Sequence, residues 1–212
     1  MMKSINEIIE HEKELLASSA NVRKSFNVFS DLNSCKNVWF AIGNRLTNGS
    51  YKVDENLKEP ITEILKWCIM DKSFKGDLQK GLLLSGEIGC GKTLTLKIFV
   101  EFMKYANKIV AQYSAIEIVE IFKSKEGKDR LFVSPLFIDD LGTEQVEINN
   151  YGTKEAPIYE IFNRRYLDRR FLMFITTNLK PSQMEERYGD RVRDRIKEMF
   201  NVMPIKGESR RK

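Results

Sequence analysis

The sequence predicts an α/β domain in which a parallel five-stranded sheet is flanked by helices and preceded by a small helical N-terminal module. Three observations support this prediction. From residue 81 onward, short apolar runs alternate with helical patterns, as in folds that join parallel strands through helices. A glycine-rich turn separates the first apolar run from the first of these helical patterns. Before residue 55, the sequence instead favours short helices.

Residues 1–55 are expected to form the helical module. Residues 5–16 carry isoleucines and leucines at helical spacing among glutamates and lysines, and aromatic residues are spaced along the polar stretch 18–50. An apolar stripe of this kind is usually core, but at a chain end it could equally bind a partner protein. We expect residues 56–212 to form a second domain, with a helix that has Pro60 near its start, because proline is tolerated in a first helical turn.

The elements of this second domain follow in order along the chain. Each apolar run has the length of a strand, and the runs fit strands that are buried on both faces. The expected strands span residues 82–84, 109–113, 136–138, 171–176 and 202–206. The expected helices span residues 92–106, 115–123, 155–168, 183–187 and 191–199.

Composition favours an ordinary soluble globular protein, with 42% hydrophobic and 31% charged residues among 212. No apolar run approaches the roughly 20 residues that span a bilayer. Residues 1–10 lack the basic and apolar regions of a signal peptide. The three cysteines form no CxxC pair and have no nearby histidine, which argues against a zinc site or disulfides. We therefore expect a cytoplasmic protein with no membrane partner.

Positive charge is concentrated at the C-terminal end. Residues 187–212 contain nine basic and four acidic residues, so this stretch accounts for the whole net charge of +5. A basic end can contact the phosphates of a nucleotide or a nucleic acid, or it can be a solvated tail. Charge alone does not decide between the two.

Residues 86–93, with the sequence GEIGCGKT, match the phosphate-binding pattern GxxxxGK[ST] at every fixed position. The glycines allow tight turns and bring backbone N–H groups close to phosphate oxygens. The helix that follows directs its positive N-terminal end at the same anion. Lys92 is expected to neutralise the β- and γ-phosphates, and the Thr93 hydroxyl to ligate Mg²⁺. The predicted ATP site comprises Gly86, Glu87, Ile88, Gly89, Cys90, Gly91, Lys92, Thr93 and Leu94.

Two carboxylates follow the apolar run 136–138. Asp139 is expected to hold Mg²⁺, and Asp140 to orient or activate the attacking water. By themselves these residues would more readily be a solvated acidic turn before Gly142, but a phosphate-binding loop requires a carboxylate on the metal side. Many such enzymes carry glutamate at the second position. Because aspartate is one methylene shorter, we expect slow hydrolysis.

Asn178 follows the apolar run FITT, residues 174–177. It could hydrogen-bond the γ-phosphate there, or it could simply cap the next turn. Arg191 and Arg195 lie four residues apart on an expected helix, so they share one face. Arginines there could stabilise the charge on a transferring phosphoryl group of the same or a neighbouring chain. They could also be an exposed helix face with Asp190 and Asp194 as partners.

As an ordered set, these segments resemble the AAA+ ATPases of the DnaC/IstB type, which include bacterial and phage replicative-helicase loaders and transposition helper ATPases. The resemblance rests on GEIGCGKT, LFIDDLG, IFNRRYLDRR, FITTN, YGDRVRDRI and GESRR, from about residue 81 to the end. It implies a P-loop AAA+ (ASCE) core, with Asn178 as the sensor-1 residue and Arg195, together with Arg191, as the arginine finger of the next subunit's site. Arg211 lies where the family often has a late arginine, and its assignment to the nucleotide site rests on that alone.

The resemblance also implies ATP-dependent self-association and a groove for single-stranded DNA. Two features depart from the family pattern: the sequence predicts no helical lid domain after the fifth strand, and the N-terminal module has no zinc-ligand pattern. If the chain is a loader, the N-terminal helices are the natural contact to the helicase.

Three functional hypotheses follow. The first is an ATPase that delivers a replicative helicase to single-stranded DNA, with hydrolysis stimulated by assembly or DNA. The second is a transposition helper ATPase of the IstB type, with a transposase as partner. The third, from another class, is a P-loop kinase for a small molecule, which would need substrate-binding arginines in a lid. A non-hydrolysing scaffold is disfavoured by the intact Lys92, Asp139 and Asp140.

Overall fold

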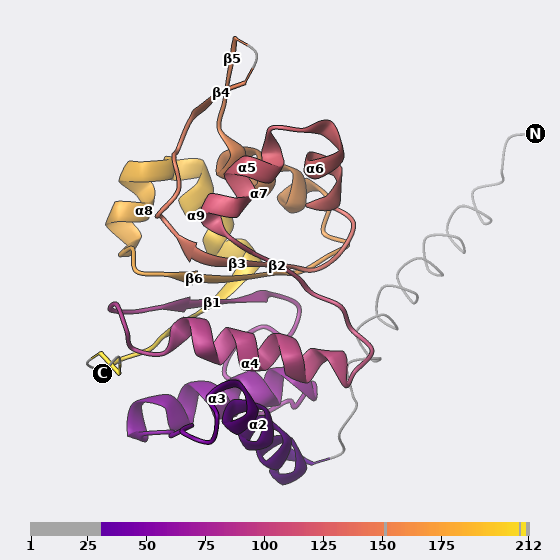
Figure 1. Cartoon of the computed structure of the whole chain (residues 1–212), viewed down its shortest axis with the longest axis vertical. Coiled ribbons are helices and arrows are strands. Elements are labelled where there is room, and N and C mark those ends of the chain that lie inside the picture. Colours follow the sequence, from indigo (N-terminus) through magenta and orange to yellow (C-terminus); the bar gives the residue numbers. More distant parts are fainter. Residues whose placement is uncertain (1–30, 151, 208, 211–212) are drawn as a thin grey trace, which may run out of the picture.

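A computed structural model describes residues 31–150, 152–207 and 209–210 of the chain (Figure 1). The helix expected within residues 5–16 and the late arginine Arg211 lie outside the described residues. Within the described part, no helix is both long and apolar enough to span a bilayer.

A parallel five-stranded sheet forms the centre of the molecule, as predicted, with the strand order β2-β3-β6-β1-β7. The strands of all four neighbouring pairs run parallel to each other. The second and fourth strands begin two residues later than predicted and the fifth begins two residues earlier, because backbone pairing rather than the apolar run sets the ends of a strand. The strands are β1 (Gly81–Ser85), β2 (Ala111–Ser114), β3 (Leu136–Leu141), β6 (Met173–Thr177) and β7 (Phe200–Pro204).

Eight helices are described. Their bounds are α2 (Leu32–Leu46), α3 (Glu55–Cys68), α4 (Lys92–Lys104), α5 (Ala115–Phe122), α6 (Lys125–Arg130), α7 (Pro157–Leu167), α8 (Pro181–Tyr188) and α9 (Asp190–Met199).

Two of these helices correct the sequence prediction. Within its described part, residues 31–50, the stretch expected to form short helices holds one helix of 15 residues, α2, which is capped where the Asp31 carboxylate accepts a hydrogen bond from the Ser34 N–H. Helix α3 begins at Glu55, because Asp54 accepts a hydrogen bond from the Leu57 N–H and caps it. Pro60 therefore lies in the second turn of α3 and not in its first.

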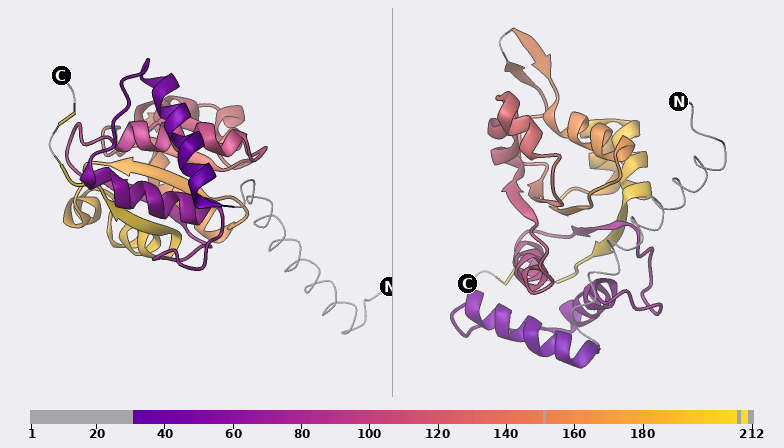
Figure 2. Two further views of the ribbon diagram at one scale, coloured as in Figure 1. Left: turned by 90° about the horizontal axis from the view of Figure 1, so that it is seen from below. Right: turned by 90° about the vertical axis from the view of Figure 1, so that its right-hand side faces the viewer.

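The helices cover the sheet in two layers, with α2, α3 and α4 on one face and α5 to α9 on the other (Figures 1 and 2). Alternation along the strands explains this arrangement, because successive side chains point to opposite faces. Leu82 and Leu84 of β1 pack with the first layer, whereas Leu83 packs with the second. The central strands β1, β3 and β6 are thus largely buried on both faces, as their apolar runs predicted. The edge strands β2 and β7 are partly exposed, which corrects that prediction for them.

A two-stranded antiparallel hairpin, β4 (Ile148–Asn150) and β5 (Thr153–Glu155), projects from the second layer (Figures 1 and 2). The sequence analysis did not predict it, since its strands are short and largely polar and give no strand periodicity. An ion pair of 2.8 Å between Lys128 and Glu155 connects its base to α6.

Candidate nucleotide site

The loop that joins β1 to α4 contains the GEIGCGKT segment. Gly89 and Gly91 have φ values of 84° and 101°, a backbone region that favours glycine. A Cβ atom at Gly89 would lie 2.3 Å from the Ser209 hydroxyl, so this position has no room for a side chain. Helix α4 begins at Lys92, directly after the loop, so its unpaired N–H groups and positive dipole end face the loop.

Lys92 connects this loop to the end of β6. Its side chain is only 4% exposed. The Nζ donates hydrogen bonds to the carbonyl oxygens of Gly86 and Glu87, both at 2.8 Å, and to Oδ1 of Asn178 at 2.6 Å. All three acceptors are uncharged, and no carboxylate of the described residues forms an ion pair with Lys92. A positive charge in this position is suited to an anion.

The carboxylate of Asp139 lies at the tip of the neighbouring strand β3 and meets the start of α4. Its Oδ1 accepts hydrogen bonds from the hydroxyls of Thr93 (2.9 Å) and Thr176 (2.6 Å). The buried Thr176 hydroxyl also accepts a hydrogen bond of 2.8 Å from the Asp140 N–H. The sequence analysis missed Thr176. The signal was its position near the carboxyl end of β6, two residues before Asn178.

Asp140 leaves the regular strand geometry. Its φ is 53°, in the left-handed region, and the pairing of β3 with β6 shifts register between Ile138 and Leu141. Aspartate tolerates this region better than most residues. The irregularity lets two successive carboxylates occupy the same strand end, with both side chains partly exposed.

Arg191 and Arg195 are on α9, in the layer opposite α4, and they contact tyrosines of α7. Neither forms an ion pair with a carboxylate of the described residues, whereas Arg193 pairs with Glu185 at 2.9 Å. Asp194, one of the alternative partners, lies 3.5 Å from Lys197 instead.

The backbone after β7 runs back over the phosphate-binding loop. We call residues 205–207 and 209–210 the C-terminal segment. The Ile205 N–H donates to the Ser85 carbonyl at 2.7 Å, and the Arg210 N–H to the Gly89 carbonyl at 3.0 Å. The Arg210 guanidinium pairs with Asp54, whose Oδ2 accepts from Nε at 2.9 Å. Sequence reasoning singled out neither Arg210 nor Asp54.

The structure therefore brings together the loop, Thr93, Asp139, Asp140 and Asn178 at the carboxyl ends of three adjacent strands. Similarity to solved structures agrees with this geometry. The crystal structure of DnaI matches with a TM-score of 0.60 and 21% identity, over 76% of this chain and 88% of DnaI. That of the DnaC helicase loader matches with a TM-score of 0.52 and 20% identity, over 74% of this chain and 93% of DnaC.

The chain has the P-loop AAA+ fold of these proteins. A replication initiator, DnaA bound to AMPPCP and single-stranded DNA, shares this fold with a TM-score of 0.55 and 19% identity, over 74% of this chain. The match spans 49% of that DnaA chain. No protein-family model and no curated protein sequence matches the chain. The predicted resemblance is thus confirmed at the level of the fold.

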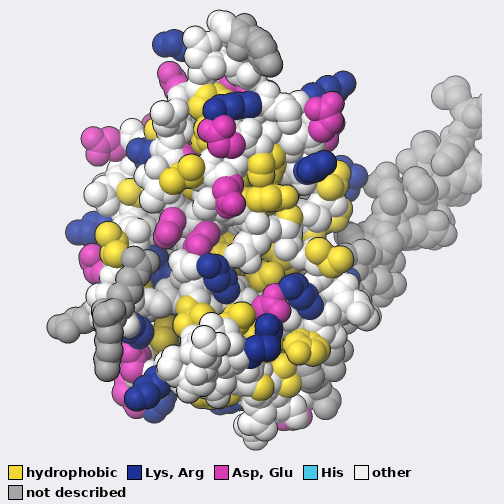
Figure 3. Space-filling view, viewed as in Figure 1, with side chains coloured by type: hydrophobic (Ala, Val, Ile, Leu, Met, Phe, Trp, Pro, Cys, Tyr) yellow, Lys and Arg dark blue, Asp and Glu magenta, His cyan; other side chains and the backbone are white. Residues whose placement is uncertain are grey.

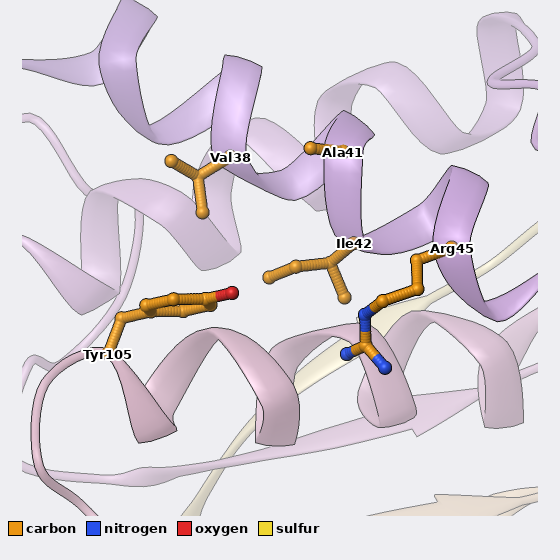
Figure 4. A pocket seen from close by; sticks show the side chains of 5 residues that line it. All are labelled: Val38, Ala41, Ile42, Arg45 and Tyr105. Carbon is orange, nitrogen blue, oxygen red and sulfur yellow. The ribbon is translucent and has the colours of Figure 1, made fainter.

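Away from the P-loop, the domain has a hollow of about 340 Å³ between α2 and the end of α4 (Figure 4). Tyr105, which lines it, follows Thr93 by twelve residues of mostly helical chain, which is about 18 Å along α4. The hollow is therefore separate from the candidate nucleotide site. Its lining residues are Val38, Ala41, Ile42, Arg45 and Tyr105.

On the face of the molecule seen in Figure 3, lysine and arginine side chains are interspersed with acidic ones. This face carries no broad area of a single sign of charge. Contacts to nucleic acid phosphates require clustered positive charge, so this view does not by itself mark a path for DNA.

Proposed function

We propose that the chain is an ATPase that acts in DNA replication as a helicase loader, delivering a replicative helicase to single-stranded DNA. One observation carries the ATPase part of the proposal: the buried Lys92 and the Thr93–Asp139 contact converge at the P-loop. The AAA+ fold that the chain shares with the DnaC helicase loader and with DnaA supports the replication part.

ATP fits the P-loop through its triphosphate. The backbone N–H groups of residues 86–94 and the Lys92 ammonium would bind the β- and γ-phosphates. Thr93 and Asp139 would hold Mg²⁺, and their hydroxyl and carboxylate oxygens are the ligands that Mg²⁺ prefers. The ion would neutralise the charge that develops on the phosphates. Arg211, outside the described residues, remains a proposed contact.

Hydrolysis requires a group that positions the attacking water. Asp140 is proposed for this role, because it stands next to the metal-side carboxylate at the end of β3. Asn178 would sense the γ-phosphate, since its amide oxygen already accepts a hydrogen bond from Lys92. A phosphate that draws Lys92 toward itself would change that hydrogen bond, so the nucleotide state could be transmitted to β6.

Arg195, with Arg191, is proposed as an arginine finger for the nucleotide of a second copy of this chain. The placement of both arginines on α9, in contact with α7, supports a role outside their own P-loop. Self-association in the presence of ATP would then complete the site. In such an assembly, single-stranded DNA would be bound mainly through its phosphates, with strong dependence on salt.

The partner protein separates the remaining hypotheses. A replicative helicase is proposed as the partner of the N-terminal module, residues 1–55, while a transposase would instead indicate a transposition helper. A pull-down from the native cell with ATP present distinguishes them by the protein recovered. Turnover stimulated by a small acceptor molecule, and not by DNA or chain concentration, would favour a small-molecule kinase.

The ATPase proposal is tested by the rate of ATP hydrolysis per chain at increasing chain concentration, with and without single-stranded DNA. We expect slow basal turnover that rises with both. The Arg195→Ala variant should bind ATP normally but lose the stimulated rate, because removing an arginine finger costs about 10³-fold or more. Full turnover in that variant would exclude the trans-acting role.

A further inference from the structure

Two tyrosine rings of α7 hold the side chain of Arg195. Its guanidinium carbon lies 5.2 Å from the ring centroid of Tyr166 and 5.9 Å from that of Tyr159. Both distances are within the range in which arginine and an aromatic ring attract each other. We call Tyr159 and Tyr166 the aromatic cradle.

One donor of Arg195 is left without a partner beside the aromatic cradle. Its Nη1 is buried and has no hydrogen-bond partner among the described residues. A buried unsatisfied donor is unfavourable, so a single chain gains little from keeping Arg195 in this place. An acceptor that comes from outside the chain would satisfy it.

Further contacts fix the orientation of the cradle itself. The Tyr166 hydroxyl donates to Oε2 of Glu198 at 3.0 Å, and Arg169 donates to the same oxygen at 3.2 Å. The Tyr159 hydroxyl accepts a hydrogen bond of 3.4 Å from Nη1 of Arg191. This hydrogen bond, together with the nearby guanidinium charges, lowers the pKa of Tyr159. Both rings are partly buried, and Tyr159 also packs against the core of the second layer.

We propose that Tyr159 and Tyr166 are positioning residues that hold Arg195 ready to contact the triphosphate of a second copy of this chain. The proposal rests on the arginine-finger role of Arg195. An arginine side chain has many rotamers, and restricting them in advance reduces the entropy lost when its contacts form. The rings attract the guanidinium, and its Nη1 remains without a hydrogen-bond partner among the described residues.

The test compares two double variants. Replacing both tyrosines by leucine keeps bulk but removes the rings, and we expect stimulated hydrolysis to fall about tenfold, in line with the loss of two weak cation–π contacts. ATP affinity should not change. Replacing both by phenylalanine keeps the rings and should preserve most of the rate. Arg193→Ala, which removes a neighbouring α9 cation paired with Glu185, is the control for loss of charge.

A mixing experiment separates positioning from misfolding. The leucine variant keeps its own P-loop, and a Lys92→Ala chain keeps an intact α9 and cradle. Each variant alone should hydrolyse ATP slowly. An excess of the Lys92→Ala chain should restore ATP turnover at the P-loop of the leucine variant. A leucine variant that had merely misfolded could not be rescued in this way.

The outcomes are distinguishable. If Arg195→Ala loses turnover but the leucine variant keeps it, the positioning role is wrong and the arginine finger stands. Equal losses in the leucine and phenylalanine variants would also overturn the positioning role, as would the absence of rescue on mixing. If Arg195→Ala keeps full turnover, the arginine finger fails and the positioning role fails with it.

Discussion

At the scale of single residues, the Thr176 hydroxyl links the two strand ends on which the candidate metal site depends. It donates to Asp139 and accepts from the Asp140 N–H, at 2.6 and 2.8 Å. Its side chain is fully buried, so water cannot replace it. Groups that orient a metal ligand commonly influence metal affinity as strongly as some ligands do.

We therefore expect Thr176→Val to raise the Mg²⁺ concentration needed for half-maximal ATP-analogue binding by about tenfold or more. Thr176→Ser should restore it, because serine keeps the hydroxyl. Thr177→Val is the matched control: Thr177 is equally buried, but its hydroxyl donates to the Leu141 carbonyl at 2.7 Å and not to Asp139. A Mg²⁺ titration followed by calorimetry measures all three. An equal shift in the control would refute the specific role of Thr176.

At the scale of elements, the C-terminal segment and the start of α3 meet beside the P-loop. Asp54 accepts from the Leu57 N–H as the N-cap of α3 and also pairs with Arg210. The Arg210 N–H donates to the Gly89 carbonyl. The P-loop is thus bounded by two segments that are 156 residues apart in the sequence.

We expect Arg210→Gln to increase amide hydrogen exchange in the P-loop and at the N-terminal end of α3, because one anchor of the C-terminal segment is lost. Global stability should change by only about 1 kcal/mol or less, since the ion pair is partly exposed to solvent. Arg45→Gln, which breaks a similarly exposed pair with Glu101 at 2.7 Å, is the control. Unchanged exchange at the P-loop, or the same increase in the control, would show that Arg210 does not anchor the segment.

At the scale of the whole molecule, the sheet and most of the site could be predicted from the sequence. Apolar runs predicted the central strands β1, β3 and β6 because these strands are largely buried on both faces. The edge strands β2 and β7 are partly exposed. The GEIGCGKT pattern and the strand-end residues Asp139 and Asn178 predicted the polar cluster, because parallel strands end at one edge. The Asp54–Arg210 pair could not be predicted, since no local pattern reports a contact between distant segments.

The packing of α2 against the rest of the domain also could not be predicted from local sequence patterns. Trp39 of α2 is fully buried, donates a hydrogen bond of 2.9 Å to the Tyr51 hydroxyl, and packs near Phe102 of α4. Helix α2 therefore contributes to the same core as the sheet, although it falls within the predicted N-terminal module, residues 1–55. The extent of that module as a separate domain stays a prediction.

Because of this shared core, we expect Trp39→Ala to destabilise the whole domain by about 3–5 kcal/mol in a single unfolding transition. Phe40→Ala, on the exposed side of the same helix, should cost much less. Urea denaturation followed by circular dichroism measures both. Two separate transitions, or equal losses from the two variants, would mean that α2 folds apart from the sheet.

The most direct test of the account is isothermal titration calorimetry of the chain with ATP and Mg²⁺. The buried Lys92 ammonium should form charge-assisted hydrogen bonds with the phosphates, each worth about 1.5–3 kcal/mol. We therefore predict saturable binding of ATP to the wild-type chain and at least a roughly 100-fold loss in Lys92→Ala. Lys97→Ala, an exposed lysine of the same helix, should bind as the wild type does. Absence of ATP binding to the wild-type chain, or equal affinity in Lys92→Ala, would contradict the account.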